Sequence, residues 1–251
     1  ASARVAGRRG SGGHARLAAL VAFVEARAAA QAAPVAGPTE ERSTGTSKRD
    51  SRGGGSVAIV LAAIEAFVRT TGWLKLAGGT KAELLMEACH QGFGHAEAGD
   101  ILVELGTLVG YTSLRLCRHG PVRSLEVDAI HVALARRVLD AGRLAPGAAE
   151  VLAGQARDGL CRLAEEAGRG AVRFAFLDHR GTTFHRDRAR LTALSLPPVW
   201  SLVLIADNVL KPGAPLLLWQ QRLERSATSW ALREFLNEQS EDWMVVSWSL
   251  P

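Results

Sequence analysis

Three runs of apolar residues, each bounded by segments with helical periodicity, restrict the fold of this chain more than any other feature. The runs are Ile101-Leu102-Val103, Phe174-Ala175-Phe176-Leu177 and Leu202-Val203-Leu204-Ile205. Strands that are apolar on both faces are typical of parallel sheets covered by helices on both sides. The sequence therefore predicts an α/β fold with a doubly wound, mostly parallel sheet, whose ligands bind beyond the C-terminal ends of the strands.

The alternation of patterns around these runs predicts the other elements. We expect strands at 100–105, 123–127, 150–153, 173–177 and 201–206, with two late candidates near 230–235 and 243–248. We expect helices at 56–71, 81–91, 112–117, 129–141, 158–167 and 186–194.

The charge distribution separates residues 1–55 from the rest of the 251-residue chain. This segment holds 9 of the 30 Lys and Arg residues and 4 of the 25 Asp and Glu residues, which leaves 21 of each sign from residue 56 onward. A nucleic-acid-binding domain concentrates basic charge on its folded surface, so the composition argues against a nucleic-acid partner. With 47% hydrophobic residues, the chain is long enough for one α/β domain, which we place at 56–251.

Residues 1–55 are rich in Ala, Gly, Arg and Ser. We predict that they form a disordered tail or leader, with a transient helix over 17–31, and that they are dispensable for folding and cofactor binding. Two interpretations stay open: an Arg-rich, acid-poor transit peptide for organellar import, and a plain solvated tail or part of a longer chain.

Cysteine spacing and hydropathy indicate where in the cell the protein is expected to reside. Cys89, Cys117 and Cys161 form no C-x-x-C pair, which favours free thiols in a reducing, cytoplasmic environment. The longest apolar run, 57–68, is interrupted by Glu65 and is too short for a bilayer. We therefore expect no membrane span, and we expect a monomer.

The end of the first strand carries a pattern suited to a nucleoside ligand. Gly106 and Gly110 allow a turn to approach a ligand closely, and Glu126 ends the second strand, where a carboxylate binds ribose hydroxyls. Glu104 would repel a pyrophosphate but attract the ammonium and sulfonium of S-adenosylmethionine. A tight strand-to-helix turn without a ligand is the alternative interpretation.

Acidic and amide side chains follow two later strands. Asp178-His179 ends the fourth strand and Asp207-Asn208 ends the fifth. Neighbouring parallel strands end at the same edge, so these oxygens can converge as the hard ligands that Mg²⁺ prefers. The alternatives are a turn or helix cap for Asp-Asn and a structural role for His179.

These motifs together resemble the catechol O-methyltransferase family from about Ser56 to the C-terminus. The matching segments occur in the family's order: Gly72-Trp73, Gly78-Gly79-Thr80-Lys81, Glu104-Leu105-Gly106, Gly110-Tyr111, Leu125-Glu126, Phe176-Leu177-Asp178-His179, Ala206-Asp207-Asn208-Val209 and Pro212-Gly213-Ala214-Pro215. The resemblance implies a Rossmann-like class I methyltransferase fold with a seven-stranded sheet. It also implies a Mg²⁺-dependent enzyme that moves the methyl group of S-adenosylmethionine to one hydroxyl of a small catechol or similar vicinal diol.

The resemblance also assigns roles to residues. The implied metal ligands are Asp178, Asp207 and Asn208, and the implied substrate contacts are Trp73, Asp178, Asn208 and Pro212. The implied cofactor contacts are Lys81, Glu104, Gly106, Gly110, Tyr111, Thr112, Glu126, Val127, Ala156, Arg157, Asp178 and His179.

The chain departs from the family at the catalytic base. Gly181 occupies the position of the family's lysine, so the catalytic residue is unknown. Without that base we expect slow methylation with an alkaline optimum, and Gly181→Lys is expected to raise the rate near neutral pH. Glu234 and Glu238 are both candidates for the family's catechol-binding glutamate.

Three functional hypotheses stay open on the sequence alone. The first is an O-methyltransferase acting on catechols or related diols. The second is a catalytically weak or silent protein that still binds S-adenosylmethionine and metal, motivated by Gly181. The third is a nucleotide-dependent oxidoreductase, against which Glu104 and the missing G-x-G-x-x-G argue.

Overall fold

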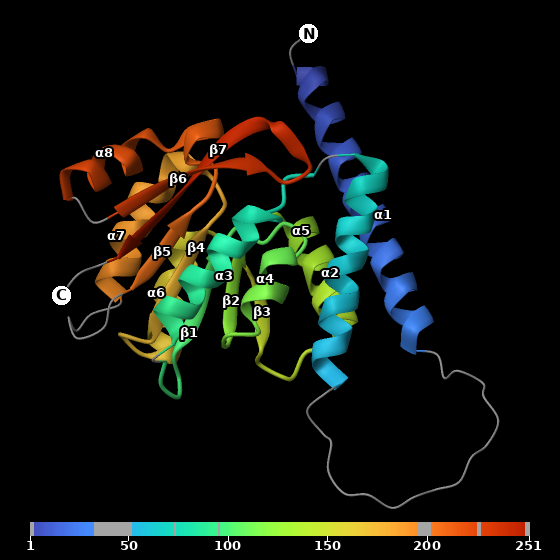
Figure 1. The fold of residues 1–251 in the computed structure, drawn as a ribbon, viewed down its shortest axis with the longest axis horizontal. Helices are drawn as coiled ribbons and strands as arrows, with labels where there is room; N and C mark the ends of the chain where they lie inside the picture. The colour runs from blue at the N-terminus through green and yellow to red at the C-terminus, as the bar shows by residue number, and fades with distance from the viewer. Residues whose placement is uncertain are drawn as a thin grey trace, which may run out of the picture.

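The described part of the chain contains one seven-stranded sheet. The computed structural model describes residues 3–32, 52–72, 74–94, 96–194, 202–224 and 227–248. The strands are β1 (Ile101–Leu105), β2 (Val122–Glu126), β3 (Ala149–Ala153), β4 (Val172–Leu177), β5 (Val203–Ala206), β6 (Ala227–Glu234) and β7 (Asn237–Trp248). Their order in the sheet is β3-β2-β1-β4-β5-β7-β6 (Figure 1). All adjacent pairs are parallel except β5 with β7 and β7 with β6, which confirms the predicted doubly wound, mostly parallel sheet.

Helices cover both faces of this sheet (Figure 1). Besides the N-terminal helix α1 (Ala3–Ala32), the α-helices of the described part are α2 (Arg52–Thr71), α3 (Thr80–Phe93), α4 (Tyr111–Leu116), α5 (Ala129–Ala141), α6 (Ala156–Ala167), α7 (Phe184–Leu194) and α8 (Pro215–Glu224). Leu102, Phe174 and Phe176 point to the face covered by α3, whereas Val103 and Ala175 join the core under α6, α7 and α8. This alternation explains why the strands are apolar throughout, because both faces are buried. Among the described residues, no helix combines the length and the hydropathy that a bilayer crossing needs.

The structure differs from the sequence-based expectation over the N-terminal segment. Residues Ala3–Ala32 form one long helix, α1, that packs against α2 and α5 (Figure 1). Leu20, Val21 and Val24 are fully buried there, and they join the same core as α2 and α5. The expected disorder is therefore wrong for this part of the tail, because Leu17, Leu20, Val21 and Val24 recur at helical spacing and bury one face. Residues 33–51 lie outside the described ranges, and the domain boundary at residue 56 stays a prediction.

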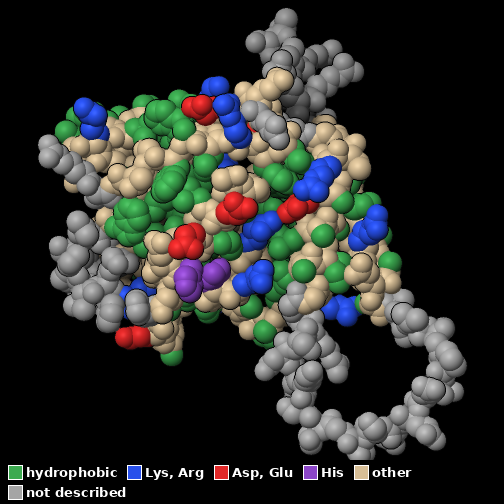
Figure 2. Space-filling model, in the orientation of Figure 1, with side chains coloured by type: hydrophobic (Ala, Val, Ile, Leu, Met, Phe, Trp, Pro, Cys, Tyr) green, Lys and Arg blue, Asp and Glu red, His purple; other side chains and the backbone are tan. Residues whose placement is uncertain are grey.

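Helix α8 is an element that the sequence analysis missed. Leu217 is buried, but Leu216, Trp219 and Leu223 on the same helix are exposed. The apolar residues of α8 therefore do not all lie on one buried face, so the sequence shows no clear helical periodicity there. Figure 2 shows apolar side chains over the part of the surface where Figure 1 places α8 and β6.

Candidate functional site

Two carboxylates meet where neighbouring parallel strands end. The backbone N–H of Asp178, just after β4, donates to the carbonyl of Leu105 at the end of β1 over 2.9 Å. The backbone N–H of Asp207, just after β5, donates in the same way to the carbonyl of Leu177 over 2.9 Å. These two bonds continue the parallel ladder beyond the strands, so the aspartates lie side by side at the C-terminal edge of the sheet, as predicted.

The burial of these aspartates gives the site its electrostatic character. Burial raises the pKa of Asp178 well above its ordinary value, and the neighbouring charge of Asp207 raises it further. Burial also raises the pKa of Asp207, although Lys81 partly offsets that effect. Two buried carboxylates that repel each other are stabilised by a cation between them.

Lys81 is the cation that the chain itself supplies to Asp207. This α3 side chain is fully buried, and its Nζ lies 2.7 Å from Oδ1 of Asp207 and 3.2 Å from Oε1 of Glu234. Oδ2 of Asp242 lies 3.9 Å away. Burial alone would lower the pKa of Lys81, but the charges of these carboxylates outweigh it and raise the pKa, so the ammonium stays protonated.

Asn208 is held beside this buried ion network. Its backbone is left-handed, with φ of 56°, which asparagine tolerates better than most residues. Its Nδ2 donates to Asp242 over 2.8 Å and to Glu234 over 3.2 Å. Asp242 is itself oriented by the backbone N–H groups of Leu210, Lys211 and Trp243. The amide orientation leaves Oδ1 of Asn208 without a hydrogen bond within the part of the chain that the structure describes.

Glu126, at the end of β2, is held ionised by the backbone around it. Its carboxylate accepts hydrogen bonds from the N–H groups of Thr107 and Leu108 in the first loop and of Val127 and Asp128 in the second. Burial opposes ionisation, but the nearby imidazole of His131 and the backbone N–H groups of Asp128 and Leu108 outweigh it and lower the pKa to about 2. A permanent negative charge therefore stands at the edge of the sheet.

The glycine turn after β1 passes directly against the end of β4. Gly106 has φ of +98°, and a Cβ atom placed there would lie 2.5 Å from the carbonyl oxygen of Asp178. Only glycine fits this approach. Glu104, one residue before the strand end, is buried and accepts hydrogen bonds from Ser113 and Ser124. Burial raises its pKa to about 7 despite these bonds, and the charge of Glu126 adds to the effect.

Comparisons with known sequences identify relatives of this chain. No family model matches the chain. A probable O-methyltransferase of Mycobacterium tuberculosis is 32% identical over 170 residues, which cover 65% of this chain and 70% of that protein. Catechol O-methyltransferase B of Danio rerio is 29% identical over 180 residues, or 68% of this chain and 63% of that protein.

The chain belongs to the O-methyltransferase family that includes the catechol O-methyltransferases.

Solved structures of O-methyltransferases share the fold. The enzyme of Bacillus cereus, in complex with SAH, superposes with a TM-score of 0.59 at 21% identity over 77% of this chain and 90% of that one. An O-methyltransferase of Streptomyces achromogenes involved in tomaymycin synthesis gives a TM-score of 0.56 at 19% identity over 81% and 92%. This confirms the class I methyltransferase fold. The chain spans 63% and 58% of the first two curated relatives that it matches.

Most of the residues predicted to contact cofactor, metal or substrate lie along one edge of the sheet. Gly106, Gly110 and Val127 lie in the loops after β1 and β2, and Ala156 and Arg157 begin α6 after β3. Arg157 is exposed and pairs with its neighbour Asp158. Pro212 lies in the π-helical turn η2 (Val209–Gly213), where it is exposed. Trp73 lies outside the described residues.

Some predicted side chains are engaged inside the protein. Tyr111 is 2% exposed, and its hydroxyl donates to Glu65 of α2 over 2.7 Å. Thr112 is buried beside it. Lys81 forms a buried ion pair with Asp207. For Lys81 and Tyr111, the structure thus gives partners within the protein, and their predicted contact with a cofactor stays a prediction.

His179 and Gly181 occupy the loop after β4. Nε2 of His179 lies 2.9 Å from Asp187 and 3.0 Å from Thr183, whereas its Nδ1 is buried without a partner among the described residues. Gly181 is packed so tightly that an added Cβ would lie 2.4 Å from the carbonyl oxygen of Gly213. The backbone of η2 therefore fills the space that a side chain at position 181 would need.

Two partners of the candidate site residues were not predicted from the sequence: Asp242, which contacts Asn208, and Glu65, which contacts Tyr111. Asp242 is fully buried and orients Asn208, but in the sequence it is one of several polar residues in a late strand and nothing distinguishes it. Glu65 interrupts an apolar run, and this interruption was a usable signal, because a charge inside such a run needs a partner. Of the two glutamates proposed near the substrate, Glu234 lies at Asn208.

Proposed function

We propose that this protein is an S-adenosylmethionine-dependent O-methyltransferase that methylates one hydroxyl of a catechol or similar vicinal diol, with Mg²⁺ as metal cofactor. The observation that carries the proposal is the juxtaposition of Asp178, Asp207 and Asn208 at adjacent strand ends. The family membership argues against the oxidoreductase hypothesis.

The residues at the sheet edge fit a hard divalent cation. Lys81 and the N–H of Asn208 both bind Oδ1 of Asp207, which leaves Oδ2 for another partner. The carboxylate of Asp178 is buried, so its ionised form is destabilised unless a cation binds it. Asn208 donates through its Nδ2, so its side-chain carbonyl oxygen can serve as a metal ligand. Mg²⁺ bound by these oxygens would lower the pKa of an adjacent acceptor hydroxyl and fix its position.

The residues after β1 and β2 fit the nucleoside cofactor that supplies the methyl group. Glu126 is ionised and stands where a carboxylate accepts hydrogen bonds from ribose hydroxyls. Nδ1 of His179 is a buried polar atom without a partner among the described residues, and a bound ligand would satisfy it. Burial raises the pKa of Glu104 to about 7, and a cationic ligand bound beside it would favour its ionised form.

The acceptor hydroxyl must lose its proton without a lysine at position 181. Gly181 has no side chain to act as a base, and the guanidinium of its neighbour Arg180 is a hydrogen-bond donor without an acceptor atom. The proton therefore leaves to solvent or to His179, and we expect the rate to rise with pH until the acceptor is ionised.

A methylation assay tests the proposal directly. The chain is incubated with S-adenosylmethionine and a panel of catechols, with Mg²⁺ or with EDTA, and methylated products are measured by mass spectrometry. Asp207→Ala is expected to need far more Mg²⁺ while it binds S-adenosylmethionine nearly as before, because the variant loses an anionic ligand. Asp140→Ala, at an exposed position of α5, is the matched control and is expected to behave like the native chain.

Each outcome of that assay is decisive for one part of the proposal. Full activity in EDTA would reject the metal requirement. Absence of product at every pH, with S-adenosylmethionine still bound, would favour the silent binding protein. Absence of both product and cofactor binding would reject the proposed function.

A further inference from the structure

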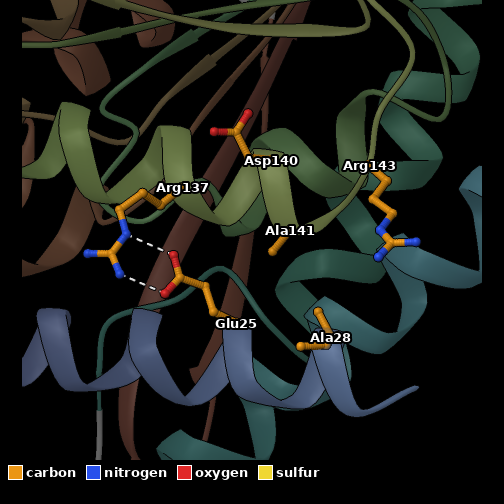
Figure 3. A pocket seen from close by; sticks show the side chains of 7 residues that line it. Glu25, Ala28, Arg137, Asp140, Ala141 and Arg143 are labelled. Carbon is orange, nitrogen blue, oxygen red and sulfur yellow. Dashed lines mark hydrogen bonds and ion pairs between the residues drawn. The ribbon is translucent and has the colours of Figure 1, made fainter. Parts of the chain in front are cut away.

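Helix α1 is fastened to α5 by polar contacts at two places. Toward its C-terminal end, Glu25 accepts two hydrogen bonds from Arg137, at 2.8 and 2.6 Å (Figure 3). Toward its N-terminal end, Nε2 of His14 lies 3.1 Å from Oδ2 of Asp128, the residue that caps α5. The position of His14 is therefore defined by the packing of the whole helix against the domain.

Three potential metal ligands meet at the second of these places. One ring nitrogen of His14, one ring nitrogen of His131 and a carboxylate oxygen of Asp128 all lie within 4.8 Å of one another. The three side chains are half-buried, so the group is open to solvent and to an entering ion. The two imidazole rings are edge-to-face, with their centroids 5.4 Å apart.

The ligand atoms are oriented by groups around them. Oδ1 of Asp128 accepts from the backbone N–H groups of Ile130 and His131, at 2.8 and 3.3 Å, while Oδ2 faces His14. Oε2 of Glu126 lies 3.8 Å from Nδ1 of His131. A carboxylate next to one ring nitrogen favours the tautomer in which the other nitrogen carries a lone pair, as is typical of metal-binding histidines.

We propose that His14, Asp128 and His131 form a Zn²⁺ site that links α1 to the start of α5. Two imidazole nitrogens and one carboxylate oxygen are a donor set that suits Zn²⁺, with water as the fourth ligand. Mg²⁺ prefers oxygen ligands alone, so it does not compete for this site. The site is separate from the proposed oxygen site at Asp178 and Asp207, and it does not depend on methyl transfer.

Metal titration of the full chain tests this site. The metal-free protein is titrated with Zn²⁺ in excess Mg²⁺, which occupies oxygen sites, and Co²⁺ is used as a spectroscopic probe of tetrahedral coordination. We expect one equivalent of Zn²⁺ to bind and to raise the melting temperature. His14→Ala and His131→Ala should each weaken binding roughly tenfold or more, because a ligand is lost.

Two further variants separate metal binding from a structural role. Asp128→Asn retains a side chain that caps α5, so it should keep the metal-free melting temperature and still lose Zn²⁺ affinity. His90→Ala removes an exposed histidine of α3 and should leave binding unchanged. The proposal is overturned if Zn²⁺ does not bind, if binding survives in both His14→Ala and His131→Ala, or if it is lost in His90→Ala instead.

Discussion

Lys81 and Asp207 are 126 positions apart in the sequence, yet Nζ of Lys81 donates to Oδ1 of Asp207 over 2.7 Å inside the protein. This contact ties α3 to the end of β5. It also places a positive charge next to Asp207, one of the proposed metal ligands. Glu234 and Asp242 are further ion-pair partners of Lys81.

Lys81→Met is expected to destabilise the protein strongly. Breaking a buried ion pair by removing one partner costs about 3 to 5 kcal/mol, because the carboxylates stay buried without compensation. Protonation of those carboxylates relieves the repulsion, so the variant should approach the stability of the native chain as the pH falls. Urea unfolding at pH 8 and pH 5 measures both effects. Lys75→Met, at an exposed position, is the control, and equal losses in the two variants would contradict the assigned role of Lys81.

Glu126 is expected to make the protein less stable as the pH falls into the acid range. Its pKa is lowered from 4.5 to about 2 in the folded state, so the stabilisation is complete above about pH 4.5 and is lost as the pH falls toward 2. Glu126→Gln should lose roughly 2 to 4 kcal/mol at neutral pH and flatten that acid dependence. It should also weaken S-adenosylmethionine binding.

Denaturant unfolding between pH 2 and 7 measures the Glu126 effect, and calorimetric titration measures the affinity. Glu166→Gln is the control, since Glu166 is exposed and pairs with Arg162 within α6, an arrangement that contributes little. If Glu126→Gln loses as much stability as the native chain between pH 7 and pH 2, other carboxylates dominate the acid dependence.

Gly181 is expected to tolerate no side chain. The carbonyl oxygen of Gly213 lies 2.4 Å from the position of an added Cβ, so Gly181→Ala should cost about 1 to 3 kcal/mol through overpacking. Gly181→Lys should be less stable still, and the structure does not favour the gain in rate that the family pattern suggests. Thermal melting compares both with Gly55→Ala, where an added Cβ meets no atom within 4 Å. An unchanged melting temperature for Gly181→Lys would show that η2 moves aside.

Leu20 tests whether α1 belongs to the folded domain. The side chain is fully buried in the core shared by α1, α2 and α5, so Leu20→Ala should lower the stability by about 2 to 5 kcal/mol. Leu223→Ala makes the same truncation on α8, where the side chain is 64% exposed, and should have little effect. Equal melting temperatures for Leu20→Ala and the native chain would restore the hypothesis of a dispensable tail.

The elements with strong local signals were predictable from the sequence. Helix α5 has the bounds that were predicted for it. Asp128 caps its N-terminus, and the apolar residues Val132, Ala135, Val138 and Leu139 recur on one face. The proximity of Asp178 and Asp207 was predictable as well. Parallel strands end at one edge of a sheet, so acidic residues that follow two adjacent strands lie close together, and successive strands are adjacent more often than not.

Local sequence determined which segments are strands, and it placed the acidic, amide and glycine residues at the strand ends. Tertiary structure alone decided the charge partners, because Lys81 in an amphipathic helix has the pattern of a solvated lysine until packing closes around it. Packing also decided that α1 folds onto α5, since a segment rich in Ala, Gly and Arg gains stability only from the apolar face it finds elsewhere. The same long-range contacts bring His14 to Asp128 across 114 positions, a proximity that no local pattern encodes.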